Sequence, residues 1–468
     1  MDIETFLTPG LGDATYLVAS EGEAALVDPQ RDAERFIEAA DRWGWRITHV
    51  LETHVHNDYV SGARQVHEQT GALIVAPAAG AYRFPWHAAD EGDAVRIGNL
   101  SLVGMATPGH TPEHIAWQIV QSGSTVPAAV LTGGSLLVGS AGRPDLLGPD
   151  LFPRLADDQF RSLQRLAALP DDVRILPTHG AGSFCVSGAV GTERESTIGI
   201  ERERNPYLRV ADSAAFRQFV EQRLGRYPAY YAHMADINRA GPTLRDGLLA
   251  PPKLTPERLA QLVDAGVRVV DARDRHHFAQ GHIPGSIHVE PTEQFGSWVG
   301  AVVPFDAPLV IVIDSTDATL IPELVVQLWR IGYEHVVGYV AGGTDTWLES
   351  GRREERHEVL SGSQLAAELV AGLATGDGYA VLDVRQPTEW REGTIPGSRT
   401  IFVGDLPQAV SDLPRDRTWT VICRSGARAS IAGSVLLRAG HRVRVVTEGG
   451  VPDVLERVAS AEAQTAAA

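Results

Sequence analysis

The sequence has little cysteine and no long hydrophobic run. Only two cysteines occur among 468 residues, which excludes the disulfide framework of small secreted proteins. No window approaches the roughly 20 apolar residues that cross a bilayer, and the start, Met1-Asp2-Ile3-Glu4, lacks the basic and apolar regions of a signal peptide. We therefore expect a cytoplasmic protein with no membrane partner.

Positive charge is also scarce. Lys and Arg total 41 against 59 Asp and Glu, a formal net charge of −18, which repels phosphate backbones. The sequence therefore predicts no nucleic-acid partner. With 44% hydrophobic and 21% charged residues the composition is that of a globular protein, and the length predicts about three domains.

Histidines gather at the ends of predicted strands in the first half of the chain. His54 and His56 follow the apolar segment 47–51 and, being two residues apart in an extended stretch, point to the same side, with Asp58 within reach. His110 follows a second predicted strand. Imidazoles that converge in this way are metal ligands, so the sequence predicts a metal site held by His54, His56 and His110. Hydrogen-bonded loop histidines are the alternative.

Two further residues lie near this predicted site. His179 ends another predicted strand in Pro177-Thr178-His179-Gly180, and Cys185 follows it closely. The sequence leaves the roles of His179 and Cys185 open. A packed, inert cysteine is the ordinary interpretation, and contact with a substrate thiol is the alternative.

The order of these motifs resembles the metallo-β-lactamase superfamily, and within it the glyoxalase II and persulfide dioxygenase branch. The resemblance rests on THxHxD at residues 53–58, TPGHTP at 107–112, a Thr-Gly strand end at 132–133 and the late His-Gly. It implies an αββα sandwich over residues 1–245. Two positions depart from the branch: Tyr59 stands where it usually has a histidine, and Gly134 where it usually has an aspartate.

These departures bear on the reaction. A two-metal hydrolase depends on both of the missing ligands, so their loss disfavours two-metal thioester hydrolysis. A mononuclear iron dioxygenase, which the resemblance implies, uses two histidines and one carboxylate. Three outcomes follow: His56 completes a three-histidine site, Asp145 supplies the carboxylate, or the pocket holds no metal. We expect a weakened site, with Fe²⁺ if it is occupied and Zn²⁺ as the alternative.

The second half of the chain contains an internal repeat with a period of about 110 residues. Val269-Val270-Asp271-Ala272-Arg273 recurs as Val381-Leu382-Asp383-Val384-Arg385. Alternating strand and helix patterns predict two small parallel-sheet α/β domains, at 246–356 and 357–460, and a disordered tail at 461–468. The Asp and Arg of each copy are interpreted as pairs that hold the fold.

The second copy carries a candidate nucleophile. A predicted strand ends at Cys423, and five residues lead from it into a predicted helix. Inward-pointing backbone N–H groups, the helix N-terminus and Arg428 all favour a thiolate. We therefore predict Cys423 and Arg428 as catalytic residues. The predicted substrate-binding residues are Arg424, Ser425, Gly426 and Ala427.

The repeat pattern and the CRSGAR loop resemble the rhodanese family. The resemblance implies that Cys423 accepts sulfane sulfur from a donor and passes it to a thiol. In the first copy the corresponding strand ends at Asp314, and Ser315-Thr316-Asp317-Ala318-Thr319 fills the loop. Because nucleophile and arginine are both missing there, this copy is expected to be structural or to shape an interface.

The combined architecture resembles fusions that detoxify sulfide. We predict a sulfurtransferase that works through a Cys423 persulfide, coupled to persulfide oxidation in the N-terminal domain. One alternative is a zinc-dependent thioester hydrolase of the glyoxalase II type, and another is a metal-free scaffold joined to a persulfide carrier. The expected partners are small molecules: persulfide, thiosulfate and a glutathione-like thiol. A homo-oligomer is left open.

Overall fold

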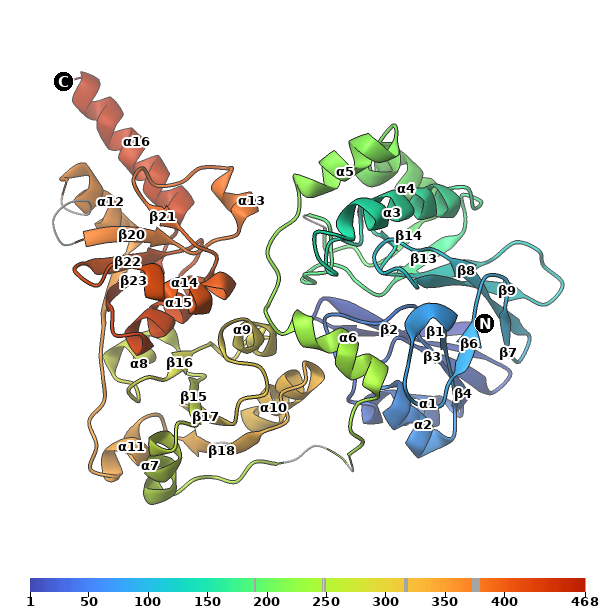
Figure 1. Cartoon of the computed structure of the whole chain (residues 1–468), viewed down its shortest axis with the longest axis horizontal. Coiled ribbons are helices and arrows are strands. Elements are labelled where there is room, and N and C mark those ends of the chain that lie inside the picture. Colours follow the sequence, from blue (N-terminus) through green and yellow to red (C-terminus); the bar gives the residue numbers. More distant parts are fainter. Residues whose placement is uncertain (189–190, 246, 248–249, 315–318, 373–378, 468) are drawn as a thin grey trace. The chain divides into compact units, whose positions relative to one another are not determined.

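The computed structural model describes residues 1–188, 191–245, 247, 250–314, 319–372 and 379–467 (Figure 1). They divide into two compact units. Unit 1 comprises Met1–Gly225, Tyr230–Leu248 and Trp329–Gly332, and unit 2 comprises Arg226–Ala229, Leu249–Leu328 and Tyr333–Ala468. The main division lies close to residue 245, where the sequence predicts the end of the first domain.

Unit 1 contains two six-stranded sheets. The first has, in spatial order, β1 (Asp2–Thr8), β2 (Asp13–Ser20), β3 (Glu23–Val27), β4 (Arg46–Leu51), β5 (Leu73–Pro77) and β6 (His87–Ala89). The second has β14 (Ser196–Thr197), β13 (Arg174–Pro177), β10 (Ala129–Gly133), β9 (Ile115–Gln121), β8 (Leu100–Ala106) and β7 (Ala94–Ile97). A short hairpin pairs β11 (Leu136–Leu137) with β12 (Ser140–Ala141).

Three apolar clusters show how the layers of unit 1 are stacked. Between the sheets, Val18 and Val27 of the first pack with Trp117 of the second. Outside the first sheet, Phe36 of α1 (Glu34–Trp43) and Val66 of α2 (Ala63–Thr70) are buried against it. Outside the second, α3 (Phe152–Ala167) and α5 (Ser213–Glu221) form the matching layer. Figure 1 shows these helix layers above and below the sheets, which confirms the αββα sandwich.

The described residues of unit 1 form four further helices. They are η1 (Ala78–Gly80), α4 (Ile198–Arg204), η2 (Pro206–Arg209) and α6 (Tyr231–Ala240).

Unit 2 contains two parallel sheets, one from each sequence repeat. Repeat 1 forms the order β16 (Ile287–His288), β15 (Arg268–Asp271), β17 (Leu309–Ile313) and β18 (Val336–Ala341). Repeat 2 forms β19 (Glu358–Ser361), β23 (Arg442–Glu448), β22 (Thr418–Ile422), β20 (Tyr379–Asp383) and β21 (Arg399–Thr400). The strand Leu309–Ile313 is apolar throughout and wholly buried, as expected of a parallel strand covered on both faces.

Helices connect the strands of both repeats. Repeat 1 has α7 (Pro256–Asp264), α8 (Arg275–Gln280), α9 (Phe295–Val302), α10 (Leu320–Arg330) and α11 (Asp345–Glu349). Repeat 2 has α12 (Gly362–Val370), α13 (Pro387–Trp390), η3 (Val403–Asp405), α14 (Leu406–Ala409), η4 (Val410–Asp412), α15 (Ala427–Arg438) and α16 (Val451–Ala467). These two α/β domains confirm the predicted fold class.

The Asp and Arg of each repeat form the same buried pair. Arg273 Nη2 lies 2.8 Å from Asp271 Oδ2 and 2.6 Å from the carbonyl oxygen of Gly281. Arg385 Nη2 lies 2.7 Å from Asp383 Oδ2 and 2.6 Å from the carbonyl oxygen of Gly393. Each arginine therefore ties the end of a strand to the turn that follows the next helix, which agrees with a fold-holding role.

The C-terminal helix differs from expectation. The sequence predicts a disordered tail at 461–468, whereas α16 continues to Ala467. Alanine and glutamate are strong helix formers, so the residues 461–467 extend the helix that begins at Val451. Among the helices that the structure describes, none is both long enough and apolar enough to span a membrane.

Candidate functional site

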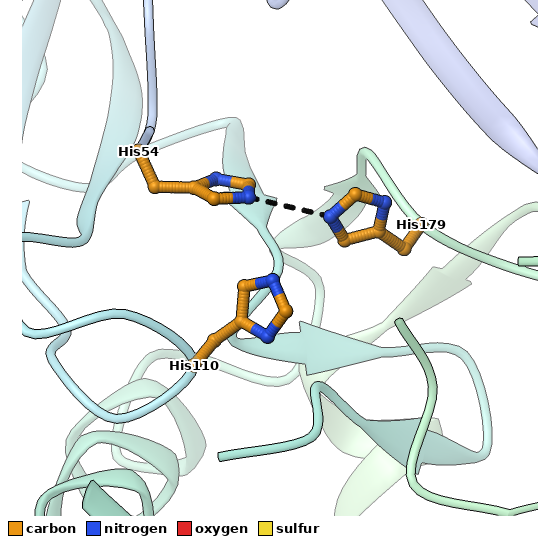
Figure 2. Close-up of side chains that lie close together, drawn as sticks. All are labelled: His54, His110 and His179. Atoms are coloured by element: carbon orange, nitrogen blue, oxygen red, sulfur yellow. Dashed lines mark hydrogen bonds between the residues drawn. The ribbon is translucent and has the colours of Figure 1, made fainter. Parts of the chain in front are cut away.

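Three histidines from separate strand ends meet inside unit 1. His54 follows β4, His110 follows β8 and His179 follows β13. All three are buried, and one ring nitrogen from each lies within 4.8 Å of the others. Figure 2 shows the imidazoles facing one another, with 3.3 Å between His54 Nε2 and His179 Nε2.

The hydrogen bonds behind two of these rings determine which nitrogen carries the proton. His110 Nδ1 lies 2.9 Å from the carbonyl oxygen of Arg143, which can only accept, so this nitrogen donates. Thr53 donates its hydroxyl proton to Asp28 and therefore accepts from His54 Nδ1 at 2.8 Å. Both histidines are left with a bare Nε2. Buried His110 Nε2 has no hydrogen-bond partner among the described residues.

Two carboxyl groups stand behind the third ring. His179 Nδ1 lies 2.8 Å from Asp13 Oδ1 and 3.3 Å from Asp58 Oδ2. Burial raises the pKa of Asp13 to about 8, and burial, together with the neighbouring Asp13, raises that of Asp58 to about 7. These carboxyl groups orient the ring so that Nε2 faces His54, as partners of metal-bound histidines do.

The three histidines fit a single divalent ion. Burial lowers the pKa of His54, His110 and His179, so the rings are neutral and their lone pairs are available. The 3.3 Å between His54 Nε2 and His179 Nε2 matches the separation of two nitrogens on one tetrahedral ion with bonds of about 2.0–2.1 Å. The orphaned Nε2 of His110 supplies the third position.

His56 lies beside His54, with 4.2 Å between the ring centroids, and its Nε2 faces carboxylates. Its Nε2 lies 2.9 Å from Glu52 and 3.3 Å from Asp28, and it is 3.0 Å from the Tyr59 hydroxyl. Burial alone would lower the pKa of His56, but the two carboxylates raise it well above its usual value. His56 belongs to two further groups that could hold a metal, one with Asp28 and His54 and one with Asp58 and His179, but it is not grouped with His54 and His110.

Asp145, which the sequence offers as a substitute ligand, is held elsewhere. Both of its carboxylate oxygens accept hydrogen bonds from Arg143, each at 2.7 Å. In the described part of the chain it belongs to no group that could hold a metal. His179, whose role the sequence leaves open, takes the third place beside His54 and His110. The signal for it was its position at a strand end before a glycine.

Gly134 leaves room for the His110 ring. A Cβ atom at this position would lie 2.2 Å from His110 Cδ2, which is far inside van der Waals contact. The backbone N–H of Gly134 also donates to His114 Nε2 at 2.9 Å. The aspartate usual in the resembling branch is thus replaced by a glycine whose missing side chain admits an imidazole. A carboxylate cannot be restored here without moving His110.

Cys185 is packed beside this cluster. Its thiol is buried, and burial raises its pKa well above the usual value. Its sulfur donates to the Tyr231 hydroxyl at 3.9 Å. A neutral, buried thiol of this kind is a poor nucleophile.

The second site surrounds Cys423 in unit 2. Cys423 follows β22, and α15 begins four residues later. The backbone N–H of Gly426 donates to Cys423 Sγ at 3.1 Å. Hydrogen bonding from backbone N–H groups at a helix N-terminus stabilises negative charge on sulfur. The loop therefore places a backbone hydrogen-bond donor on the sulfur of Cys423.

The other predicted residues of this loop have distinct environments. Arg428 binds both carboxylate oxygens of Glu389 in α13, at 2.5 and 2.9 Å, and its guanidinium also interacts electrostatically with Cys423. Arg424 and Ser425 are exposed, Gly426 is buried and Ala427 is half-buried. The sequence did not identify Glu389, which orients the arginine.

The corresponding loop of repeat 1 has a carboxylate in place of the thiol. Asp314 follows β17, and its Oδ2 lies 2.8 Å from His277 Nδ1. This hydrogen bond raises the pKa of His277. Ser315, Thr316, Asp317 and Ala318, which the sequence assigns to the loop, lie outside the described residues.

Comparisons with known proteins agree with this architecture. Residues 8–179 match the metallo-beta-lactamase superfamily, and residues 255–350 and 365–455 match the rhodanese-like domain. The chain is 33% identical over 285 residues to a hydroxyacylglutathione hydrolase of Cereibacter sphaeroides (strain ATCC 17025 / ATH 2.4.3), covering 60% of this chain and 97% of that protein.

A second hydroxyacylglutathione hydrolase, from Methylococcus capsulatus, is 32% identical over 210 residues, covering 44% of this chain and 77% of that protein. Among solved structures, a metallo-beta-lactamase from Staphylococcus aureus subsp. aureus COL is similar, with 30% identity and a TM-score of 0.65. That likeness covers 73% of this chain and 99% of the other.

Proposed function

Because the chain belongs to the metallo-beta-lactamase superfamily and carries two rhodanese-like domains, we propose that it is a sulfur-metabolism enzyme that moves sulfane sulfur through a persulfide on Cys423. The observation that carries the proposal is the 3.1 Å hydrogen bond from the Gly426 N–H to Cys423 Sγ. A backbone donor aimed at sulfur stabilises the thiolate that must attack the donor.

The reaction has two displacement steps. The Cys423 thiolate attacks the outer sulfur of thiosulfate or of a persulfide; the new S–S bond forms as the old one breaks, and sulfite or a thiolate leaves. An acceptor thiolate, such as that of a glutathione-like thiol, then attacks the outer sulfur of the Cys423 persulfide and the Cys423 thiolate leaves. Neither step needs an external oxidant or reductant.

Mass spectrometry tests the first step. Incubation with thiosulfate should add one sulfur atom to the peptide that contains Cys423, and cyanide should remove it as thiocyanate. Addition of sulfur to Cys185 instead, or to neither cysteine, would contradict the proposal.

For the histidine cluster of unit 1 we propose a second, metal-dependent activity, the oxidation of a persulfide. The fit of His54, His110 and His179 to one ion supports a metal centre, and the sulfur chemistry of Cys423 in the same chain supports a sulfur substrate. When bound, a divalent ion there would supply a Lewis acid with open positions for substrate and oxygen. The residues behind the rings, Thr53, Asp13 and the Arg143 carbonyl, hold the imidazoles in place.

A zinc-dependent thioester hydrolase is the second candidate, because three neutral imidazoles also suit zinc and the similar curated proteins are hydroxyacylglutathione hydrolases. Elemental analysis of protein expressed with both metals, followed by oxygen-uptake and thioester-cleavage assays, separates the two. Iron with persulfide-dependent oxygen uptake supports oxidation. Zinc with thioester cleavage supports the hydrolase and contradicts oxidation.

A pair of variants tests which histidines hold the ion. His179→Ala removes one of the three converging nitrogens and should abolish stoichiometric metal binding. His56→Ala removes a ring whose Nε2 faces two carboxylates, so we expect it to retain metal. Metal loss in His56→Ala with retention in His179→Ala would reverse the assignment and restore the set predicted from the sequence.

A further inference from the structure

The loop that carries Cys423 receives an arginine from the other repeat. Arg275 begins α8 in repeat 1, and its Nη1 donates to the carbonyl oxygen of Ser425 at 2.7 Å. The same nitrogen lies 3.4 Å from the carbonyl oxygen of Thr447 at the end of β23. Repeat 1, which has Asp314 in place of a nucleophile, thus places a positive charge on the loop of repeat 2.

The guanidinium of Arg275 is held in one orientation by Glu290. Arg275 Nε lies 2.9 Å from Glu290 Oε1, and Arg275 Nη2 lies 2.5 Å from Glu290 Oε2. Two parallel hydrogen bonds of this kind fix both the position and the plane of a guanidinium. Glu290 therefore leaves Nη1 directed at the carbonyl of Ser425.

This contact acts on the hydrogen bond to the thiol sulfur through a single peptide group. The carbonyl of Ser425 and the N–H of Gly426 belong to one planar trans peptide, and they point in opposite directions. Arg275 binds the carbonyl, and the N–H donates to Cys423 Sγ at 3.1 Å. With the carbonyl held on one side, the N–H must face the sulfur on the other.

Gly426 shows that the approach of the arginine is close. Its φ is +92°, a left-handed conformation that favours glycine. A Cβ atom there would lie 2.3 Å from the Thr447 carbonyl oxygen and 2.5 Å from Arg275 Nη1. No side chain at position 426 is compatible with this arrangement.

We propose that Arg275 is a positioning residue for sulfur transfer, which holds the Ser425–Gly426 peptide so that its N–H donates to Cys423. The proposal rests on the proposed function of Cys423 and adds to it that repeat 1 completes the site of repeat 2. It also accounts for a difference between the copies. When the repeats are aligned on their shared Asp and Arg, Arg275 of repeat 1 corresponds to Pro387 of repeat 2. Proline carries no charge and cannot make this contact.

The test compares Arg275→Gln with Arg438→Gln. Arg438 is a matched control because its Nη1 also donates to a backbone carbonyl of the other repeat, that of Gly285, at 2.7 Å. Arg438 lies at the opposite end of α15 from the Cys423 loop. The readouts are the rate of persulfide formation from thiosulfate, the pH profile of Cys423 alkylation by iodoacetamide, and the melting temperature.

Arg275→Gln should slow persulfide formation by about tenfold or more, the usual effect of losing one charge-supported hydrogen bond. It should also move half-maximal alkylation to higher pH, because the thiolate loses part of its stabilisation. Arg438→Gln should leave both quantities unchanged. Arg275→Lys keeps the charge without the two-pronged geometry and should fall between the wild type and Arg275→Gln.

Equal rates and equal alkylation profiles in Arg275→Gln and Arg438→Gln would overturn the proposal. A second result would also overturn it: a lower rate in Arg275→Gln together with a lower melting temperature and an unchanged alkylation profile. That combination is expected of a contact that only stabilises the fold. If Arg275→Gln does not fold, Glu290→Gln releases the guanidinium and should change the rate and the profile in the same direction. Absence of sulfur transfer in the wild type would refute the function of Cys423, while the alkylation profile would still report on Arg275.

Discussion

The two rhodanese-like repeats share their parallel strands and buried Asp–Arg pair, but they have different kinds of side chain at two corresponding positions. Six residues after the shared aspartate of each copy, repeat 2 has Glu389 and repeat 1 has His277. Glu389 binds Arg428 beside the thiol of Cys423. His277 binds Asp314, which stands in the place of that thiol. At this position repeat 2 has a carboxylate that orients an arginine. Repeat 1 has an imidazole there, and it pairs with a carboxylate.

This difference separates the residues that hold the fold from those that would carry out the proposed sulfur transfer. The buried Asp–Arg pair and the parallel strands are present in both copies, so the framework forms without the cysteine. Repeat 1 has Asp314 in place of the thiol and still contacts repeat 2. His288 of β16, for example, lies 2.8 Å from Ser430 in α15.

The comparison predicts its largest effect for the pair Cys423→Ser and Asp314→Ala. Cys423→Ser removes the nucleophile, so sulfur transfer from thiosulfate to cyanide should fall to background. Asp314→Ala, at the corresponding position, should retain wild-type transfer. Thiocyanate formation measures both. Residual transfer in Cys423→Ser would mean that another group carries the sulfur.

The next largest effect concerns stability. Asp271→Ala and Asp383→Ala each leave a buried arginine without its carboxylate, which costs about 3–5 kcal/mol. Because the two pairs have nearly the same geometry, the losses should be similar in size. Urea unfolding followed by circular dichroism measures them. A large loss of unfolding free energy in only one variant would show that the Asp–Arg pair does not stabilise both repeats.

Glu389→Gln should have an intermediate effect, confined to repeat 2. The amide weakens the hold on Arg428, so we expect sulfur transfer to fall by about tenfold. Steady-state kinetics with thiosulfate gives the result. Its counterpart, His277→Ala, serves as the control and should transfer sulfur at the wild-type rate. Equal losses in the two variants would contradict the distinction between the repeats.

The smallest effect is the pH dependence of the His277–Asp314 pair. The bond to Asp314 raises the pKa of His277, so the pair stabilises the folded state below the unfolded pKa of about 6.5 and loses this contribution as pH rises through the folded pKa. The His277 side chain is 56% exposed, and solvent screening limits the contribution to about 0.2–1 kcal/mol. Melting temperatures of His277→Ala should be lower than wild type at pH 5 and equal at pH 9. A difference that persists at pH 9 would refute the charge-based account.

The fold could be predicted from the sequence because its signals are local. Apolar strands that end at turn residues, and the Asp-x-Arg repeated at 271–273 and 383–385, specify the two α/β domains without knowledge of distant contacts. The end of α16 was less predictable. The alanine-rich run at 461–467 has a composition that suits both a helix and a frayed tail. Only its high intrinsic helix propensity favours the helix.

The histidine cluster shows where sequence reasoning reaches its limit. The spacing of His54 and His56 suggests a common direction, and their ring centroids lie 4.2 Å apart, but it does not reveal that Nε2 of His56 faces Glu52 and Asp28. His179 lies 125 residues from His54 in the chain, and a strand end alone does not show which loops meet. Arg275 was equally hidden, because its partner carbonyl belongs to a different repeat.

The burial of Cys423 has a consequence for the proposed sulfur transfer. The residue is 1% exposed, so little of its surface is open to bulk solvent. A bound sulfane sulfur extends the side chain by one S–S bond of about 2.05 Å. In the proposed transfer the acceptor thiol attacks the outer sulfur, which lies one bond beyond the buried sulfur of Cys423. The acceptor would therefore need to approach less deeply than the sulfur donor does.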